Sequence, residues 1–315
     1  IWDKNNAMFS NLIKIKQTAE GHGAKTLRNH RLKVAFFDYQ GQIFKLKDVL
    51  VSRQEQSSLI LEDPNRVPHA LLLDSEGNSF FNSRIEADSL SFFLNNLHNI
   101  TDEFVISTVL QRTAYMVTIG ALSALDFAKL VGRLVGNRGD SMSPILLQEA
   151  LNFADYIVRE FTPEQSKTEL KNILYEGCIK LLRRGNYDAT SYQIIGNEIW
   201  KFLARKEQVR EVLVLTRELL ANSLEIISLR NIYELFKACY KVDKDNQHYN
   251  EFIQLVNAAG YKNSTVEIYS HWLQRVINQD PEQELPLFKE SKGGDFEGLR
   301  VALSSLAAQN YLKRL

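Results

Sequence analysis

Two hydrophobic patterns divide the chain. Residues 12–16 alternate apolar and polar positions and residues 32–37 do so more loosely, and a period of two is typical of a half-buried sheet. From Asp88 onward the apolar positions recur every three or four residues, which indicates amphipathic helices. The pattern predicts a β domain over residues 1–87 and an α-helical domain over residues 88–315.

Turn residues separate further strands in the first region. Gly41 and Gly77 each lie in a short polar stretch between two apolar runs, which predicts two hairpins. Several short strands with such turns are typical of a small β-sandwich rather than of a parallel sheet. The strands expected after residues 12–16 are residues 34–39, 43–51, 58–62, 70–73 and 80–85.

Helix boundaries are marked in the second region. Ser143 followed by Pro144 is typical of a first helical turn, and Gly120 and Gly136 are expected at helix ends. About a dozen helices joined by short loops, with no strict repeat, predict an irregular, HEAT-like superhelix of stacked antiparallel pairs. The expected fold class is therefore α+β as two domains. The expected helical stripes run through residues 90–97, 104–110, 127–134, 146–161, 170–182, 192–203, 209–220, 232–240, 252–259, 266–277 and 296–312.

Charge and cysteine content argue against several classes of function. The 38 Lys and Arg residues balance 38 Asp and Glu residues, so no global field favours nucleic acid or anionic lipid as a partner. No apolar stretch approaches the ~20 residues of a membrane-spanning helix. Cys178 and Cys239 lie in helical patterns without C-x-x-C spacing, which predicts a reducing, cytoplasmic compartment. Because the chain begins at Ile1 and ends directly from a helical run, we expect it to be part of a longer protein.

Catalytic motifs are missing from the sequence. None of the six histidines begins the H-E-x-x-H pattern, which places two zinc ligands one helical turn apart. The G-x-S-x-G, G-x-x-x-x-G-K-[ST] and G-x-G-x-x-G patterns are also missing. We therefore expect no catalytic, cofactor-binding or metal-binding residue in this chain. The Arg-Gly-Asp triplet at residues 138–140 is interpreted as a polar loop between helices rather than as an adhesion motif.

Basic residues cluster at or near the ends of expected helices. The residues concerned are Arg183, Arg184, Arg205 and Arg210. One interpretation is that they favour the negative end of the helix dipole. The other is that they line a groove that receives a peptide carboxylate through charge-assisted hydrogen bonds. The sequence leaves both interpretations open.

Three stretches in the first half of the chain have a specific sequence pattern. The first is residues 26–41, TLRNHRLKVAFFDYQG. The second joins residues 68–74, PHALLLD, to residues 84–90, RIEADSL. The third runs from Met116 to residues 126–131, DFAKLV. These stretches resemble the aminopeptidase N-type zinc metallopeptidases, the gluzincin aminopeptidases. Their order and spacing are similar to those of the family over roughly residues 12–164.

The resemblance implies a parent enzyme in which this chain is the C-terminal, non-catalytic portion. Such a parent removes N-terminal residues from peptides with zinc, and its zinc ligands and catalytic groups lie in an upstream domain. The β-sandwich and helical superhelix would close the substrate chamber over that zinc domain. Its partners would be the catalytic domain of the same parent chain and the peptide substrate, and the chain alone would be inactive. The alternative is a non-enzymatic scaffold that binds a protein partner along a concave helical face.

Overall fold

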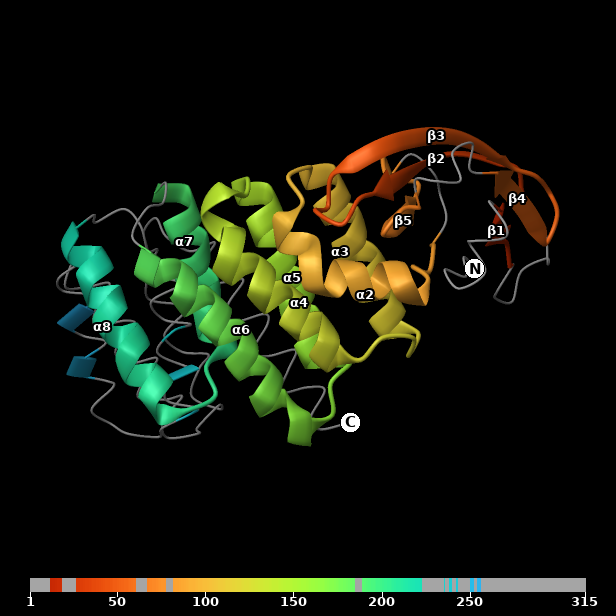
Figure 1. The fold of residues 1–315 in the computed structure, drawn as a ribbon. Coiled ribbons are helices and arrows are strands. Elements are labelled where there is room, and N and C mark those ends of the chain that lie inside the picture. The colour runs from red at the N-terminus through yellow and green to blue at the C-terminus, as the bar shows by residue number, and fades with distance from the viewer. Residues whose placement is uncertain are drawn as a thin grey trace, which may run out of the picture. The chain divides into compact units, whose positions relative to one another are not determined.

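The computed structural model describes residues 12–18, 27–60, 67–77, 82–184 and 189–222, with single positions at 235, 238, 239, 242, 250, 251, 254 and 255. Residues 1–204 form one compact unit and residues 205–315 form a second. The first unit contains a small antiparallel β region followed by a mostly helical part (Figure 1). The predicted change from strands to helices near residue 87 is confirmed, while the division into domains at that residue stays a prediction.

The strands of the described residues form two antiparallel sheets. β1 (Leu12–Lys16) pairs with β4 (Gln56–Ile60). In the second sheet β2 (His30–Phe37) is the central strand, between β3 (Ile43–Val51) and β5 (Ala70–Leu73).

The turn between β2 and β3 is the predicted hairpin. Gly41 has a φ of 85°, a left-handed conformation that glycine adopts without steric strain. The Asp38 carboxylate accepts hydrogen bonds from the backbone N–H groups of Gln40 and Gln42, each at 2.9 Å. The second predicted hairpin is wrong in part, because residues 82–85 lie outside any strand; residues 78–81 lie outside the described part.

One hydrophobic cluster joins the inner faces of the two sheets. Central strand β2 is buried on both faces, since Val34, Ala35, Phe36 and Phe37 in succession are fully buried. The strand therefore reads as a nearly continuous apolar run rather than as a clean alternation. The cluster consists of Ile13, Ile15 and Leu59 from the smaller sheet, and of Leu32, Val34, Phe36, Val49, Val51 and Leu71 from the larger one.

The other face of the larger sheet is covered by the first helix, α2 (Ala87–Asn96). The Phe37 ring meets the edge of the Phe93 ring with 5.3 Å between centroids. The Ser89 hydroxyl accepts a 2.9 Å hydrogen bond from the buried backbone N–H of Leu71 in β5. The β region and the helical part thus share packed contacts and a buried hydrogen bond.

Short connections and local capping groups define the remaining helices. Asp102 and Ser143 cap two of these helices, because their side-chain oxygens accept bonds from first-turn N–H groups. Pro144 follows Ser143 at the first helical position, as predicted. None of the helices in the described part is long and apolar enough to cross a membrane. The elements are η1 (Leu97–Asn99), α3 (Glu103–Thr118), α4 (Ala124–Arg138), η2 (Gly139–Ser141), α5 (Pro144–Glu160), α6 (Glu164–Arg184), α7 (Ala189–Glu198) and η3 (Ile199–Phe202) in the first unit, and α8 (Lys206–Asn222) in the second.

Alternate helices of the first unit pack beside one another in two layers. Helices α2, α4 and α6 contact each other in sequence, and so do α3, α5 and α7, while consecutive helices from α3 to α7 contact across the layers. Glycines allow α4 and α6 to approach closely, since Gly132 and Gly136 of α4 face Gly177 of α6. The prediction that Gly136 ends a helix is therefore wrong: it lies inside α4. Most of the stripes expected after residue 222 lie outside the described residues.

Candidate functional site

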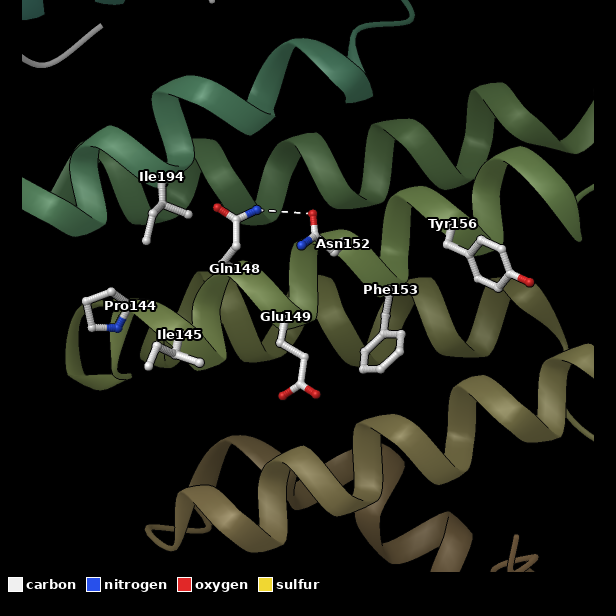
Figure 2. A pocket seen from close by; sticks show the side chains of 8 residues that line it. All are labelled: Pro144, Ile145, Gln148, Glu149, Asn152, Phe153, Tyr156 and Ile194. Atoms are coloured by element: carbon white, nitrogen blue, oxygen red, sulfur yellow. Dashed lines mark hydrogen bonds between the residues drawn. The ribbon is translucent and has the colours of Figure 1, made fainter. Parts of the chain in front are cut away.

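A hollow of about 700 Å³ lies along one face of α5 (Figure 2). The opposite face of α5 is buried, with side chains such as Leu147, Leu151 and Ile157 packed in the helical core. Because α5 turns its second face outward, positions three and four apart line the hollow together. We call this hollow the α5 groove; its lining residues are Pro144, Ile145, Gln148, Glu149, Asn152, Phe153 and Tyr156 of α5, and Ile194 of α7.

Large apolar side chains near the groove are exposed. Ile145 is 82% exposed and Tyr156 is 43% exposed, although both are residue types that favour burial. Phe104, at the start of α3, is also 74% exposed. The starts of α3 and α5 are joined, because the Glu103 carboxylate accepts a 2.6 Å hydrogen bond from the backbone N–H of Ser143. This end of the helical layer therefore offers apolar surface to a partner.

The groove carries one carboxylate, and α3 holds it in place. Glu149 accepts a 2.7 Å hydrogen bond from the Ser107 hydroxyl and a 3.1 Å bond from Gln111 Nε2. Both donors are neutral, so they orient the carboxylate without neutralising its charge. A separate bond, from Gln148 Nε2 to Asn152 Oδ1 at 3.1 Å, fixes the two amides on the side toward α7 (Figure 2).

No nucleophile or metal centre can be assembled from these groups. Ser107 bonds to a carboxylate and not to an imidazole, so the groove lacks the Ser–His pair of an activated nucleophile. Within the described ranges, no three His, Cys, Asp or Glu residues gather closely enough to hold a metal ion.

The described histidines lie apart from the groove. His30 begins β2 and His69 precedes β5, where its ring lies 6.1 Å from the Tyr39 ring. His98 lies in η1, where burial lowers its pKa and the charges of Arg133 and Lys180 lower it further. His22, His248 and His271 lie outside the described residues.

Two of the four predicted arginines end α6. Arg183 and Arg184 are exposed, and Arg184 donates a 2.8 Å hydrogen bond to the carbonyl oxygen of Asn137 near the end of α4. Arg184 also lies 3.7 Å from the Asp140 carboxylate. These contacts agree with the interpretation that cations favour helix C-termini.

The other two predicted arginines belong to the second unit. Arg205 and Arg210 are exposed, and the backbone N–H of Arg205 donates to Gln208 Oε1 at the start of α8. A shared carboxylate-binding site formed by all four arginines stays a prediction.

The Arg-Gly-Asp triplet is engaged within the fold. Arg138 donates a 3.2 Å hydrogen bond to the carbonyl oxygen of Thr101, and Asp140 faces Arg184. Gly139 is buried, and a Cβ there would collide with the Leu181 side chain. The triplet connects two helices, but the expected polar loop is wrong in part, because Arg138 ends α4 and Gly139 and Asp140 lie in η2.

Sequence patterns did not identify the α5 groove. Residues 146–161 were expected to form one buried stripe, and that stripe is present. One sequence feature could have indicated the groove: Ile145 and Tyr156 lie outside this buried stripe. A helix of this sequence must therefore expose these two side chains or cover them with a partner. The role of Glu149 could not be predicted from local sequence, because its hydrogen-bond donors Ser107 and Gln111 are about forty positions away in sequence. In comparisons with known proteins, neither a protein family model nor a curated protein matches the chain.

Proposed function

We propose that this chain is the C-terminal, non-catalytic portion of a zinc-dependent aminopeptidase of the aminopeptidase N type. In this proposal it closes the substrate chamber over a zinc domain elsewhere in the same parent chain. The parent removes N-terminal residues from peptides, in a reducing, cytoplasmic compartment. Peptide substrate and the zinc domain are its partners.

The observation that carries the proposal is where the three family-like stretches fall in the fold. Residues 26–41 contain β2 and the turn into β3, and residues 68–74 contain β5. Residues 84–90 lead into α2, and residues 116–131 run from the end of α3 into α4. The first and third stretches and the start of the second thus lie on the types of element that the family resemblance implies, in the implied order. The return strand that the resemblance implies at Arg84 and Ile85 is missing, because residues 82–85 lie outside any strand.

The finer architecture of the proposal is a β-sandwich followed by a HEAT-like superhelix. The hydrophobic cluster shared by the two sheets supports the sandwich, because such cores form between facing sheets. The two helical layers support the superhelix, because stacked antiparallel pairs place alternate helices side by side.

Zinc is assigned to the parent and not to this chain. The residues of the described part do not fit a zinc site, since no cluster of three or more ligating side chains is found among them. No hydrolytic step is therefore assigned to them. Their role in the proposal is to bind and enclose the peptide, which limits access of water and orders the substrate.

The test uses the isolated chain and the full-length parent. The isolated chain should hydrolyse no aminoacyl-coumarin reporter, and the coding sequence of the parent should contain H-E-x-x-H. Removing residues 1–315 from the parent should alter how its turnover depends on peptide length. Turnover by the isolated chain that a chelator abolishes would contradict the proposal, as would a parent without the zinc motif.

A second candidate is a non-enzymatic scaffold, and the exposed apolar residues favour it. Ile145 and Phe104 present surface at one end of the helical layer, as expected where a protein partner docks. A parent that lacks the zinc motif and still captures a protein through this face would favour the scaffold over the peptidase.

A further inference from the structure

We infer that the α5 groove binds a peptide segment that has apolar side chains on either side of one basic side chain, with the basic group seated on Glu149. This inference does not depend on the aminopeptidase proposal, because it concerns a groove within the described helices.

The shape of the groove fits an elongated occupant. Its lining runs from Pro144 to Tyr156 along α5, which spans about 18 Å at 1.5 Å per residue. An extended peptide of about five or six residues covers that distance. The hollow of about 700 Å³ lies within the range typical of ligand sites, and its exposed side chains leave it open along its length.

The lining requires apolar side chains from the occupant. Pro144, Ile145, Phe153 and Ile194 offer hydrocarbon surface, and Tyr156 adds an aromatic ring. Covering these side chains removes apolar area from water, which is the main favourable term in most association reactions. The Tyr156 ring is held in position, since it lies edge-on against the Phe161 ring at 5.3 Å between centroids.

Charge complementarity selects a cation. Among the residues that the structure describes, Glu149 is the only acidic or basic one that lines the groove, and its described hydrogen-bond donors, Ser107 and Gln111, are neutral. A carboxylate has about four acceptor sites, so the hydrogen bonds from Ser107 and Gln111 leave room for a further donor. An arginine or lysine side chain would supply a charge-assisted bond, whereas an anionic group would be repelled.

Phe153 provides a second contact for the basic side chain. It follows Glu149 by four residues, and Figure 2 shows both side chains projecting to the same side of α5, toward α3. The methylene stem of arginine or lysine can pack on the ring while its charged end reaches the carboxylate. This combination favours a basic side chain over a small free cation.

The test compares two capped, fluorescein-labelled peptides. Each has leucines on both sides of a central residue and serines at the ends; the centre is arginine in one and citrulline in the other. Citrulline keeps the shape of arginine but lacks its charge. Fluorescence anisotropy with the full chain should give an affinity about fivefold higher for the arginine peptide, as expected for a partly exposed ion pair.

Variants separate the charge from the apolar contacts. Glu149→Gln should remove the preference for arginine and leave the affinity for the citrulline peptide unchanged. Ile145→Ser should weaken both peptides by a similar factor. Glu160→Gln, which removes an exposed carboxylate at the far end of α5, should change neither. Circular dichroism checks that each variant is folded.

Two results would overturn the inference. One is that neither peptide binds the unmodified chain up to about 1 mM, the range of the weakest specific complexes. The other is that the arginine preference survives in Glu149→Gln or is absent in the unmodified chain. Neither result bears on the aminopeptidase proposal, which the zinc motif and the turnover of the parent decide.

Discussion

The carbonyl oxygen of Gly132 in α4 lies 2.6 Å from the point where a Cβ atom would stand on Gly177 in α6. The Cα of Gly132 lies 2.9 Å from the same point. A Cβ on Gly132 would itself lie 2.9 Å from the carbonyl oxygen of Ile173. Backbone therefore faces backbone between the two helices, and only glycine fits on both sides.

Substituting alanine for Gly177 is expected to destabilise the protein. In an open helix this change stabilises by about 1 kcal/mol, because alanine has the higher helix propensity. Here the new methyl group meets backbone atoms that cannot rotate away, so we expect a loss of about 1–3 kcal/mol. Urea unfolding of Gly177→Ala and of the neighbouring exposed control Glu176→Ala measures the difference. A gain in stability for Gly177→Ala would contradict the close approach.

The buried ion pair between Arg112 of α3 and Asp74 after β5 gives a second prediction. The two groups lie 3.4 Å apart with side chains 9% and 1% exposed. Burial lowers the pKa of Arg112, and the Asp74 charge partly restores it. Arg112→Met should reduce the free energy of unfolding by about 3 kcal/mol, because it leaves a carboxylate buried without its cation.

Two variants serve as controls for the Arg112 substitution. Lys33→Met breaks the exposed pair of Lys33 with Glu76, and it should have little effect. Adding Asp74→Asn to Arg112→Met should recover part of the loss, since asparagine tolerates the positive φ of 51° at this position. Equal effects of Lys33→Met and Arg112→Met in urea unfolding would show that burial of the pair is unimportant.

Cys178 predicts a loss of stability at high pH. Burial, with a smaller contribution from the charge of Glu198, raises the pKa of its thiol from 9.0 to about 12. The folded protein keeps this proton at pH values where the unfolded chain loses it. The contribution of the protonated thiol to folding stability is therefore complete below pH 9 and is lost as the pH rises toward 12.

The measurement compares the unmodified chain with Cys178→Ala from pH 8 to pH 11. The stability advantage of the unmodified chain should shrink by about 1.4 kcal/mol per pH unit once the pH exceeds 9. Other titrating groups are common to both proteins and largely cancel in the difference. A constant difference over this range would mean that the thiol ionises equally in both states.

The lowered pKa of His98 predicts that the protein loses stability at low pH, the opposite of the effect expected from Cys178. Burial lowers its pKa below 6.5, and Arg133 and Lys180 lower it further. The unfolded chain takes up the proton first, so the contribution to stability is present above pH 6.5 and is lost as the pH falls through the lowered pKa. Proton NMR of the imidazole should show the pKa rising in Arg133→Gln. Lys129→Gln, an exposed change on the same helix, should leave it where it is.

Local sequence patterns were sufficient to predict those elements whose stabilising contacts lie close in sequence. The β2–β3 hairpin follows from Gly41 and Asp38, and the start of α5 follows from Ser143 and Pro144. The Gly77 turn also forms, since its N–H bonds to the carbonyl oxygen of Asp74. A turn does not ensure that the next segment pairs, however, and residues 82–85 run toward the α2 cap instead of returning as a strand.

Contacts between distant segments could not be predicted from pattern. Gly136 was expected to end a helix because glycine often does, but its place inside α4 depends on Gly177 of another helix. The orientation of Glu149 likewise depends on Ser107, which only the packing of α3 beside α5 brings close. Both failures have the same physical cause. The tertiary fold decides which helix packs against a given helix face, and hydrophobic periodicity does not identify that helix.

The glycine contact between α4 and α6 also affects the α5 groove. Helix α5 packs against both α4 and α6, whose separation is set by main-chain atoms and not by rotatable side chains. A support of that kind has little freedom to adjust when a ligand arrives. We therefore expect the backbone beneath the groove to move little on association, which keeps the entropy cost of binding to that of the side chains.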